Sequence, residues 1–366
     1  MIRKKIMFYT MILQKGGTEK TITNLANYFI SEYDITIVTN INKKSEYVLN
    51  EKIKHICIDL VDKSKENILK KIFTKLSYKR SAQLKEIINS EKPDIILTFL
   101  PEPTIRVLAL KKHFKKIPMI VCIRNHPTKE YYYPLLKKVR DYYYTKANTI
   151  IIQDKKYEKY LNKNIEHKIE VIPNYISEEF ILNNKIQKKE KKIVTVTRLE
   201  KQKNISLLIK AFSKLDNKFN DYKLYIYGEG SKKTKLEKIV KKLRLTDRII
   251  FLGKVDDINN AIKDAMLFIL SSNYEGMPNA LLEAMALSLP VISTRSTEVI
   301  DSIIKNNENG IVVSKKNVNE LTSKIEYVLN NIKKSNSMGK KAGQVQITHN
   351  KKNIIKKWES ILKKYL

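Results

Sequence analysis

The 366-residue sequence is poor in the residues that would mark a disulfide-stabilised or metal-binding protein. Its only cysteines are Cys57 and Cys122, too few for a disulfide framework or a metal site. No uninterrupted apolar run approaches the roughly 18–20 residues that a membrane-spanning helix needs. The N-terminus is basic and then apolar, as in a signal peptide, but Gln14 and Glu19 follow too soon. We therefore expect a cytoplasmic protein.

Acidic residues are also scarce beside basic ones, 38 against 71, which leaves a formal net charge of +33. Such an excess attracts polyanions, namely nucleic acid, an anionic bilayer surface or a phosphorylated ligand. We expect no nucleic-acid partner, because the sequence has no zinc-ligand spacing, RNP-like run or recognition helix. The hydrophobic fraction of 42% suffices for ordinary cores, and the length predicts two domains.

One stretch near the middle of the second half has the pattern of a ligand-binding loop in a parallel sheet. An apolar run at 265–270 is followed by a turn with Gly276 and Pro278, a helical segment, and a second apolar run after Pro290. Strand, loop, helix and strand in this order are typical of a parallel sheet. Ligands bind beyond the carboxyl ends of such strands, and the N–H groups from Gly276 to Asn279 favour an anion there.

Glycines also follow the first expected strand, at residues 4–10. Gly16 and Gly17 precede a helix over about 18–31, and Glu19 lies at the start of that helix. Two glycines let a phosphate or a facing domain come close to the backbone. An ordinary strand-to-helix turn explains a lone pair of glycines equally well, so both interpretations stay open.

Two carboxylates, Glu275 and Glu283, lie eight residues apart in the stretch that follows the apolar run at 265–270. The string from Glu275 to Ala286, EGMPNALLEAMA, followed by LPVIST, resembles the E-x7-E signature of retaining glycosyltransferases, family 4 in particular. Ser288 stands where that family usually has glycine. Without the surrounding string, a solvated loop Glu and a helix-start Glu would explain these residues.

Two further motifs extend the resemblance over nearly the whole chain. Residues 171–176, VIPNYI, are similar to the V-I-P-N-G element that ends the first domain of the family. The segment from Arg198 to Asn204, RLEKQKN, resembles the G-R-L-x-x-x-K-N motif, with Thr197 in place of glycine. Arginine offers a rigid fork to phosphate oxygens and lysine a point charge, a pair that suits a nucleotide diphosphate.

The resemblance implies an α/β protein of the GT-B class, in which two Rossmann-like domains face each other across a cleft. We expect the first domain at residues 1–175, a linker at 176–192 and the nucleotide-sugar-binding domain at 193–348. A closing helix at 349–366 would cross back to the first domain.

It also implies a reaction and roles for the motif residues. A sugar would pass from a nucleotide diphosphate sugar, with UDP the commonest nucleotide in the family, to a hydroxyl with retention at the anomeric carbon. No cofactor or metal is expected. Arg198 and Lys203 would neutralise the leaving diphosphate. Glu275 would hold the sugar without having to act as a nucleophile, and Glu283 would hold the ribose.

The remaining expected site residues rest on the same resemblance. Arg124 or His126, after the strand at 119–123, would take the place of a cleft histidine of the family. The other expected substrate-binding residues are Gly16, Gly17 and Glu19 beside the diphosphate, Gly228 and Glu229 near the nucleotide, and Gly276, Met277, Pro278, Asn279 and Ala280 around the sugar.

Two basic stretches of the first domain point to the acceptor. Residues 64–80 place apolar residues on one helical face among lysines, and residues 129–146 mix six tyrosines with lysine and arginine. Such helices can lie in a membrane interface, although ordinary surface helices explain either stretch alone. We predict association with the anionic inner face of the cell membrane and a polyprenyl-diphosphate-linked saccharide acceptor, as in capsule or O-antigen synthesis.

Two other functions remain open at this point. One is a nucleotide-sugar 2-epimerase of the same architecture, for which the sequence shows no additional cleft acids and histidines. The other is a non-catalytic polyanion- or membrane-binding protein, which would have no need of Arg198, Lys203, Glu275 and Glu283 together.

Overall fold

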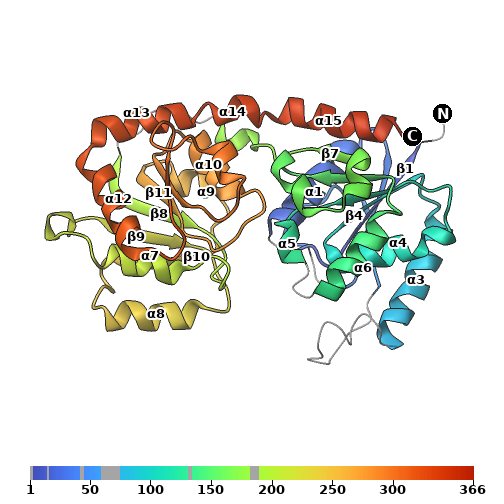
Figure 1. Cartoon of the computed structure of the whole chain (residues 1–366), viewed down its shortest axis with the longest axis horizontal. Helices are drawn as coiled ribbons and strands as arrows, with labels where there is room; N and C mark the ends of the chain where they lie inside the picture. Colours follow the sequence, from blue (N-terminus) through green and yellow to red (C-terminus); the bar gives the residue numbers. More distant parts are fainter. Residues whose placement is uncertain (1–2, 15, 42–44, 59–74, 131–133, 182–188) are drawn as a thin grey trace. The chain divides into compact units, whose positions relative to one another are not determined.

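The computed structural model describes residues 3–14, 16–41, 45–58, 75–130, 134–181 and 189–366. The chain divides into two compact units (Figure 1). The first unit comprises Met1–Pro173 and Lys356–Leu366, and the second comprises Asn174–Ile355. The first division thus lies two residues before the boundary expected at residue 175. Most of the basic stretch at 64–80, and residues 182–188 of the expected linker, fall outside the described residues.

The first unit is built on a sheet of parallel strands in the order β3-β2-β1-β4-β5-β6-β7. Every residue of β4, β5 and β6 is buried, as expected of strands that helices cover on both faces. The strands are β1 (Lys5–Thr10), β2 (Asp34–Thr39), β3 (Lys54–Cys57), β4 (Ile95–Phe99), β5 (Met119–Cys122), β6 (Thr149–Ile152) and β7 (Ile169–Val171).

Helices connect β1 to β2, β3 to β4, β4 to β5 and β5 to β6, and each of these connections is a β-α-β crossover. The helices are α1 (Gly17–Phe29), α3 (Lys75–Glu91), α4 (Pro101–Ala109), α5 (Pro127–Glu130) and α6 (Pro134–Tyr144). The last helix of the chain, α15 (Lys351–Lys363), contributes its C-terminal part to this unit. Tyr365 after it lies 2.7 Å from Thr149 of β6, hydroxyl to hydroxyl.

The second unit repeats the architecture with the strand order β10-β9-β8-β11-β12-β13, again parallel. Its strands are β8 (Glu190–Val196), β9 (Lys223–Tyr227), β10 (Ile249–Gly253), β11 (Ala265–Leu270), β12 (Val291–Thr294) and β13 (Ile311–Val313). Its helices are α7 (Ile205–Phe212), α8 (Lys233–Lys242), α9 (Ile258–Ile262), α10 (Asn279–Ala286), α11 (Ile300–Ile303), α12 (Val318–Asn330), α13 (Ile332–Ala342) and α14 (Val345–Thr348).

Counted from its own first strand, each sheet begins with the order 3-2-1-4-5, which is the Rossmann order. The strand order therefore reverses between β1 and β4 in the first sheet and between β8 and β11 in the second. The prediction of two Rossmann-like domains is confirmed. The short edge strands β7 and β13 were not expected, because three-residue strands carry almost no periodic signal.

Ser288, the residue that replaces the family's glycine, has a left-handed backbone with φ of +56°. It lies between α10 and β12, and its N–H donates to the carbonyl of Met285 at 2.9 Å. Helix α13 covers the turn closely, since a Cβ atom on Gly339 would lie 2.3 Å from the Ser288 carbonyl oxygen. The turn thus keeps the conformation that favours glycine, at a cost for serine.

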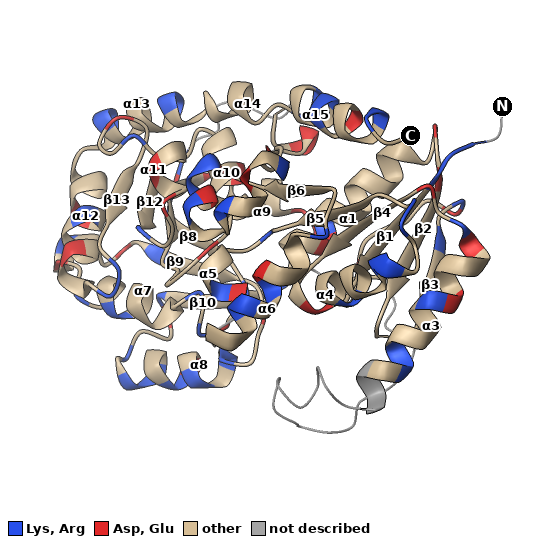
Figure 2. Cartoon of the chain, turned by 45° about the vertical axis from the view of Figure 1, so that its right-hand side comes forward, with Lys and Arg blue, Asp and Glu red and all other residues tan. Residues whose placement is uncertain are grey.

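The positive charge is spread over both units. The first has 38 Lys and Arg against 19 Asp and Glu, and the second has 33 against 19. Figure 2 shows basic residues on α8 and α13 as well as on α3 and α6. Charge alone therefore does not distinguish the first unit as a membrane-facing one. Among the described helices, none is both long and apolar enough to cross a membrane.

Candidate active site

The second sheet brings two of the predicted loops together at the point where its strand order reverses. The loop after β8 carries Arg198 and Lys203, and the loop after β11 carries Glu275. Because β8 and β11 are neighbours and parallel, their carboxyl ends lie at the same edge of the sheet. Residues more than 70 positions apart in the sequence thus become one site.

The centre of this site is a buried ion pair. Lys203 Nζ lies 2.6 Å from Glu275 Oε1, and the two side chains are only 16% and 7% exposed. Ser272 donates a hydrogen bond to the same carboxylate oxygen at 2.5 Å. Burying either charge alone would be costly, so each holds the other in place.

Further hydrogen bonds join the two loops. Ser271 donates through its hydroxyl to the Lys203 carbonyl at 3.0 Å, and the Gln202 side chain donates to the Tyr274 carbonyl at 2.9 Å. From β12, Thr294 donates to the carbonyl of Ser272 at 2.6 Å. The positions of Lys203 and Glu275 are therefore set by their backbones as well as by their charges.

Arg198 differs from Lys203 in being exposed. Its loop is held from the side by Glu200, whose carboxylate accepts hydrogen bonds from the N–H and the hydroxyl of Ser231, both at 2.8 Å. These bonds lower the pKa of Glu200. The guanidinium is thus presented to solvent on a braced loop, where an anion could reach it.

The glycine turn after β9 packs directly on this loop. Gly228 has a φ of +127°, and a Cβ atom there would lie 1.9 Å from the Thr197 carbonyl oxygen. A Cβ atom on Gly230 would lie 2.6 Å from the carbonyl oxygen of Leu199. The Leu199 N–H in turn donates to the Glu229 carbonyl at 2.8 Å. The two glycines are therefore required for packing, whatever contact the turn makes with a ligand.

The start of α10 is fixed by a residue that the sequence marked only as the end of the first domain. The side-chain amide of Asn174 donates to Asn279 Oδ1 and, at 3.4 Å, to the carbonyl of Met277. Gly276, Met277 and Pro278 are buried, whereas Asn279, Ala280 and Glu283 are partly exposed. The sequence could have indicated Asn174 only through its place in the V-I-P-N-Y string. Nothing in the sequence indicated Ser272 or Gln202 except that they lie close to the motif residues.

The other predicted residues lie in the first unit. Gly16 precedes α1, and its backbone N–H and carbonyl both bond the hydroxyl of Tyr47, at 3.1 and 3.0 Å. Gly17 and Glu19 lie in the first turn of α1, and Glu19 is close enough that a Cβ atom on Gly16 would meet its carboxylate at 2.2 Å.

Arg124 and His126 have different surroundings. Arg124 Nη2 donates to the Thr21 hydroxyl at 3.1 Å, and that hydroxyl donates to the carbonyl of Gly17 at 3.0 Å. His126 is 8% exposed, its Nδ1 accepts from the Thr128 N–H at 3.3 Å, and its ring packs on Tyr157 and Tyr160. Arg124 is therefore the one connected to the glycine turn.

Comparison with known families accounts for most of the chain. Residues 177–345 match the model "Glycosyl transferases group 1", and residues 15–180 match "Glycosyltransferase Family 4". The chain belongs to the glycosyltransferases that these two models define, and its two parallel-sheet units have the GT-B fold. The resemblance to glycosyltransferase family 4 is thereby confirmed.

Among its relatives is a Campylobacter jejuni enzyme named GalNAc-alpha-(1->4)-GalNAc-alpha-(1->3)-diNAcBac-PP-undecaprenol alpha-1,4-N-acetyl-D-galactosaminyltransferase, 27% identical over 96% of this chain and 97% of its own. Another is the amylovoran biosynthesis glycosyltransferase AmsD of Erwinia amylovora, 22% identical over 98% and 99%. A solved structure of Anabaena HepE in complex with UDP matches with a TM-score of 0.79 at 14% identity, covering 98% of this chain and all of that one.

Proposed function

We propose that this glycosyltransferase moves a sugar from a UDP-sugar to a saccharide linked to a polyprenyl diphosphate, with retention at the anomeric carbon and without a metal ion. The observation that carries the proposal is the buried pair of Lys203 and Glu275 beside the exposed Arg198, all at the strand-order reversal of the second sheet. This is where a parallel α/β sheet binds its ligand.

The arrangement suggests a separate role for each of the three charged residues. Arg198 receives the diphosphate as a bidentate partner, and Lys203 stabilises the negative charge that develops as the sugar–phosphate bond breaks. Glu275 keeps Lys203 in place and accepts hydrogen bonds from sugar hydroxyls. Glu283 lies on α10, eight residues after Glu275, and would hold the ribose as in the family's arrangement. Arg124 takes the role of the family's cleft histidine.

The acceptor and the nucleotide are inferred from the relatives. The Campylobacter enzyme is named for a polyprenyl-diphosphate saccharide and for alpha linkages, AmsD is named for a bacterial polysaccharide, and HepE was solved with UDP. Transfer for a surface polysaccharide such as a capsule or O-antigen is the simplest function that accommodates all three.

Helix α6 is the membrane contact in this proposal. Leu135 and Tyr142 are 63% and 60% exposed, and Lys138 is exposed as well. Arg140 does not take part, because it is 3% exposed and donates to Asp141 and to the carbonyl of Pro127. Aromatic and apolar side chains beside a lysine suit the headgroup region of a bilayer.

The test is a panel of UDP- and GDP-sugars with and without a lipid-diphosphate saccharide, in the presence and absence of EDTA. We expect transfer from one UDP-sugar, unaffected by EDTA. NMR should show that the transferred sugar has the same anomeric configuration in the product as in the donor. Arg198→Ala and Glu275→Ala should abolish transfer. Inversion of the linkage, or transfer only with a divalent metal, would contradict the proposed chemistry.

The same panel separates the two alternatives. A 2-epimerase would change the sugar of the nucleotide donor without an acceptor. A non-catalytic polyanion-binding protein would show no turnover and no gain in thermal stability from a nucleoside diphosphate. For α6, replacement of Leu135 and Tyr142 by serine should weaken binding to anionic vesicles several-fold and leave transfer to a water-soluble acceptor unchanged.

A further inference from the structure

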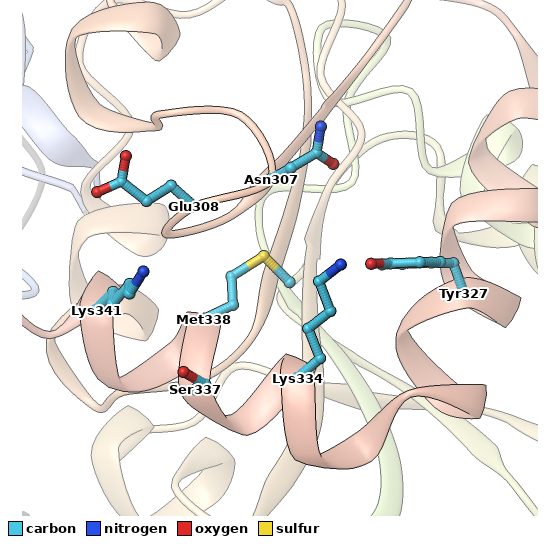
Figure 3. A pocket seen from close by; sticks show the side chains of 7 residues that line it. All are labelled: Asn307, Glu308, Tyr327, Lys334, Ser337, Met338 and Lys341. Carbon is cyan, nitrogen blue, oxygen red and sulfur yellow. The ribbon is translucent and has the colours of Figure 1, made fainter.

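The second unit has a hollow of about 240 Å³ that none of the proposed donor-binding residues lines (Figure 3). It lies between the loop before β13 and the helices α12 and α13. The residues around it are of mixed chemistry, with two lysines, a carboxylate, an amide, a hydroxyl, an aromatic ring and a thioether. They are Asn307, Glu308, Tyr327, Lys334, Ser337, Met338 and Lys341.

The loop on one side of the hollow is held rigidly. The Asn309 side chain accepts from the Lys305 N–H at 2.8 Å, and the Asn306 side chain accepts from the Val312 N–H at 2.9 Å. The Asn307 N–H donates to the carbonyl of Gly310 at 2.8 Å, with Asn307 itself at a φ of +63°. The side chains of Asn307 and Glu308 are thus carried on a fixed backbone.

The opposite side is one face of a helix. Lys334, Ser337, Met338 and Lys341 are spaced i, i+3, i+4 and i+7 on α13, so their side chains share that face. Met338 is 4% exposed and forms the floor, with its sulfur in the middle of the hollow in Figure 3. Lys334 Nζ lies 5.5 Å from the centre of the Tyr327 ring.

Four polar side chains around the hollow have unused bonding capacity. Within the described part of the chain, Asn307, Glu308, Ser337 and Lys341 make no side-chain hydrogen bond or ion pair. The backbone that carries these four groups is fixed, so binding has to order only their exposed side chains.

We propose that this hollow binds a single acidic sugar residue. The Met338 thioether offers an apolar surface to a sugar ring. The Tyr327 hydroxyl, which points toward the hollow in Figure 3, can bond the sugar's hydroxyls together with the amide, hydroxyl and carboxylate side chains. Two ammonium groups against one carboxylate leave one positive charge for the sugar's acidic group. The volume is below the roughly 300–1,000 Å³ of sites for drug-sized ligands, which fits one ring.

Such a site would hold a sugar unit of the saccharide chain away from the reacting bond. It depends on the chain being a glycosyltransferase and not on the proposed donor or acceptor. Its failure is therefore distinguishable from failure of the donor site, which is measured separately by UDP binding.

The test uses the full chain with methyl glucuronide as probe, followed by NMR or calorimetry, with methyl glucoside and inorganic phosphate for comparison. We expect saturable binding with Kd on the order of 1 mM, at least 10-fold weaker binding of methyl glucoside, and no change when UDP is saturating. A trisaccharide that contains one glucuronate should bind more tightly than methyl glucuronide if the site serves a chain, and equally if it serves a free sugar acid.

Matched variants show whether the hollow is responsible. Lys334→Glu and Lys341→Glu should each weaken methyl glucuronide binding about 10-fold or more, whereas Lys333→Glu and Lys340→Glu change the same charge on the same helix outside the hollow and should leave it within about two-fold. Equal weakening by all four, no saturation up to roughly 50 mM, or equal binding of methyl glucoside would each overturn the proposal. Inorganic phosphate that binds as tightly as methyl glucuronide would overturn the assignment to a sugar.

Discussion

The two sheets share a strand order but differ in what lies at the point where it reverses. In the second unit this point carries an ion pair, Lys203 with Glu275, beside an exposed arginine. In the first unit, Tyr9 at the end of β1 donates to Asn40 at 2.6 Å, and burial raises its pKa. Both reversals carry charge, because Glu102, just after β4, lies 2.9 Å from Arg106 and 3.6 Å from Arg80, whose side chains are only 4% and 9% exposed. The difference is that the second unit also leaves an arginine, Arg198, open to solvent.

A second contrast concerns one carboxyl group in each unit. Glu275 is paired with an ammonium group, whereas Glu130 of the first unit accepts a hydrogen bond from the hydroxyl of Tyr144 at 3.1 Å. Burial raises the pKa of Glu130 to about 7. Because the same fold carries both arrangements, the loops and not the topology determine which charged groups each unit holds.

The largest effect is expected from breaking the charged pair. Lys203→Met should lower kcat by about 10²–10³-fold and destabilise the second unit by about 3 kcal/mol, because the buried Glu275 carboxylate would lose its counter-charge. Lys203→Met with Glu275→Gln should regain most of the stability and none of the activity. Thermal unfolding and transfer assays on the same preparations measure both, and a double variant as unstable as the single one would contradict the pairing.

The glycine turns should respond differently in the two units. Gly228→Ala places a Cβ atom 1.9 Å from the Thr197 carbonyl oxygen at a φ of +127°, so we expect a loss of at least about 2 kcal/mol and of UDP binding. Gly16→Ala meets only the end of the flexible Glu19 side chain, and its φ of −168° is open to any residue. It should cost under about 1 kcal/mol. Equal losses in the free energy of unfolding for the two variants, measured by denaturant unfolding, would contradict this prediction.

The raised pKa of Glu130 predicts a pH dependence confined to the first unit. The folded protein holds a proton on Glu130 up to about pH 7, whereas the unfolded chain releases it near pH 4.5. Stability from this group therefore falls as the pH rises from 4.5 to 7, by on the order of 1–3 kcal/mol. Glu130→Gln should flatten that part of the melting-temperature profile. An unchanged slope in the variant would show that the carboxyl ionises normally.

The smallest effect concerns the turn at Ser288. Ser288→Gly should stabilise the second unit by up to about 1 kcal/mol, because glycine adopts the observed φ of +56° without strain. Ser302→Gly on α11, an exposed helical position, is the control and should destabilise by a similar amount. A destabilising Ser288→Gly would mean that the serine side chain makes up for its backbone conformation.

Much of the fold followed from the sequence, for a physical reason. Parallel strands buried on both faces are continuous apolar runs, so the strand at 265–270 and the one after Pro290 were recognisable locally. The E-x7-E and R-L-x-x-x-K-N strings identified the family because each motif is contiguous in the sequence and contains all of its charged residues. Edge strands such as β13, with three residues, were too short to carry such a pattern.

What the sequence determined by itself was thus the class of fold, the family and the charged groups of the loops after β8 and β11. Only the tertiary structure decided that β8 and β11 are neighbours, which brings Lys203 to 2.6 Å from Glu275 across 72 positions. It alone showed that Arg140 is buried, that Asn174 fixes the start of α10, and that seven residues of three segments surround a hollow. Contacts between distant segments depend on strand order and packing, which no local pattern of residues contains.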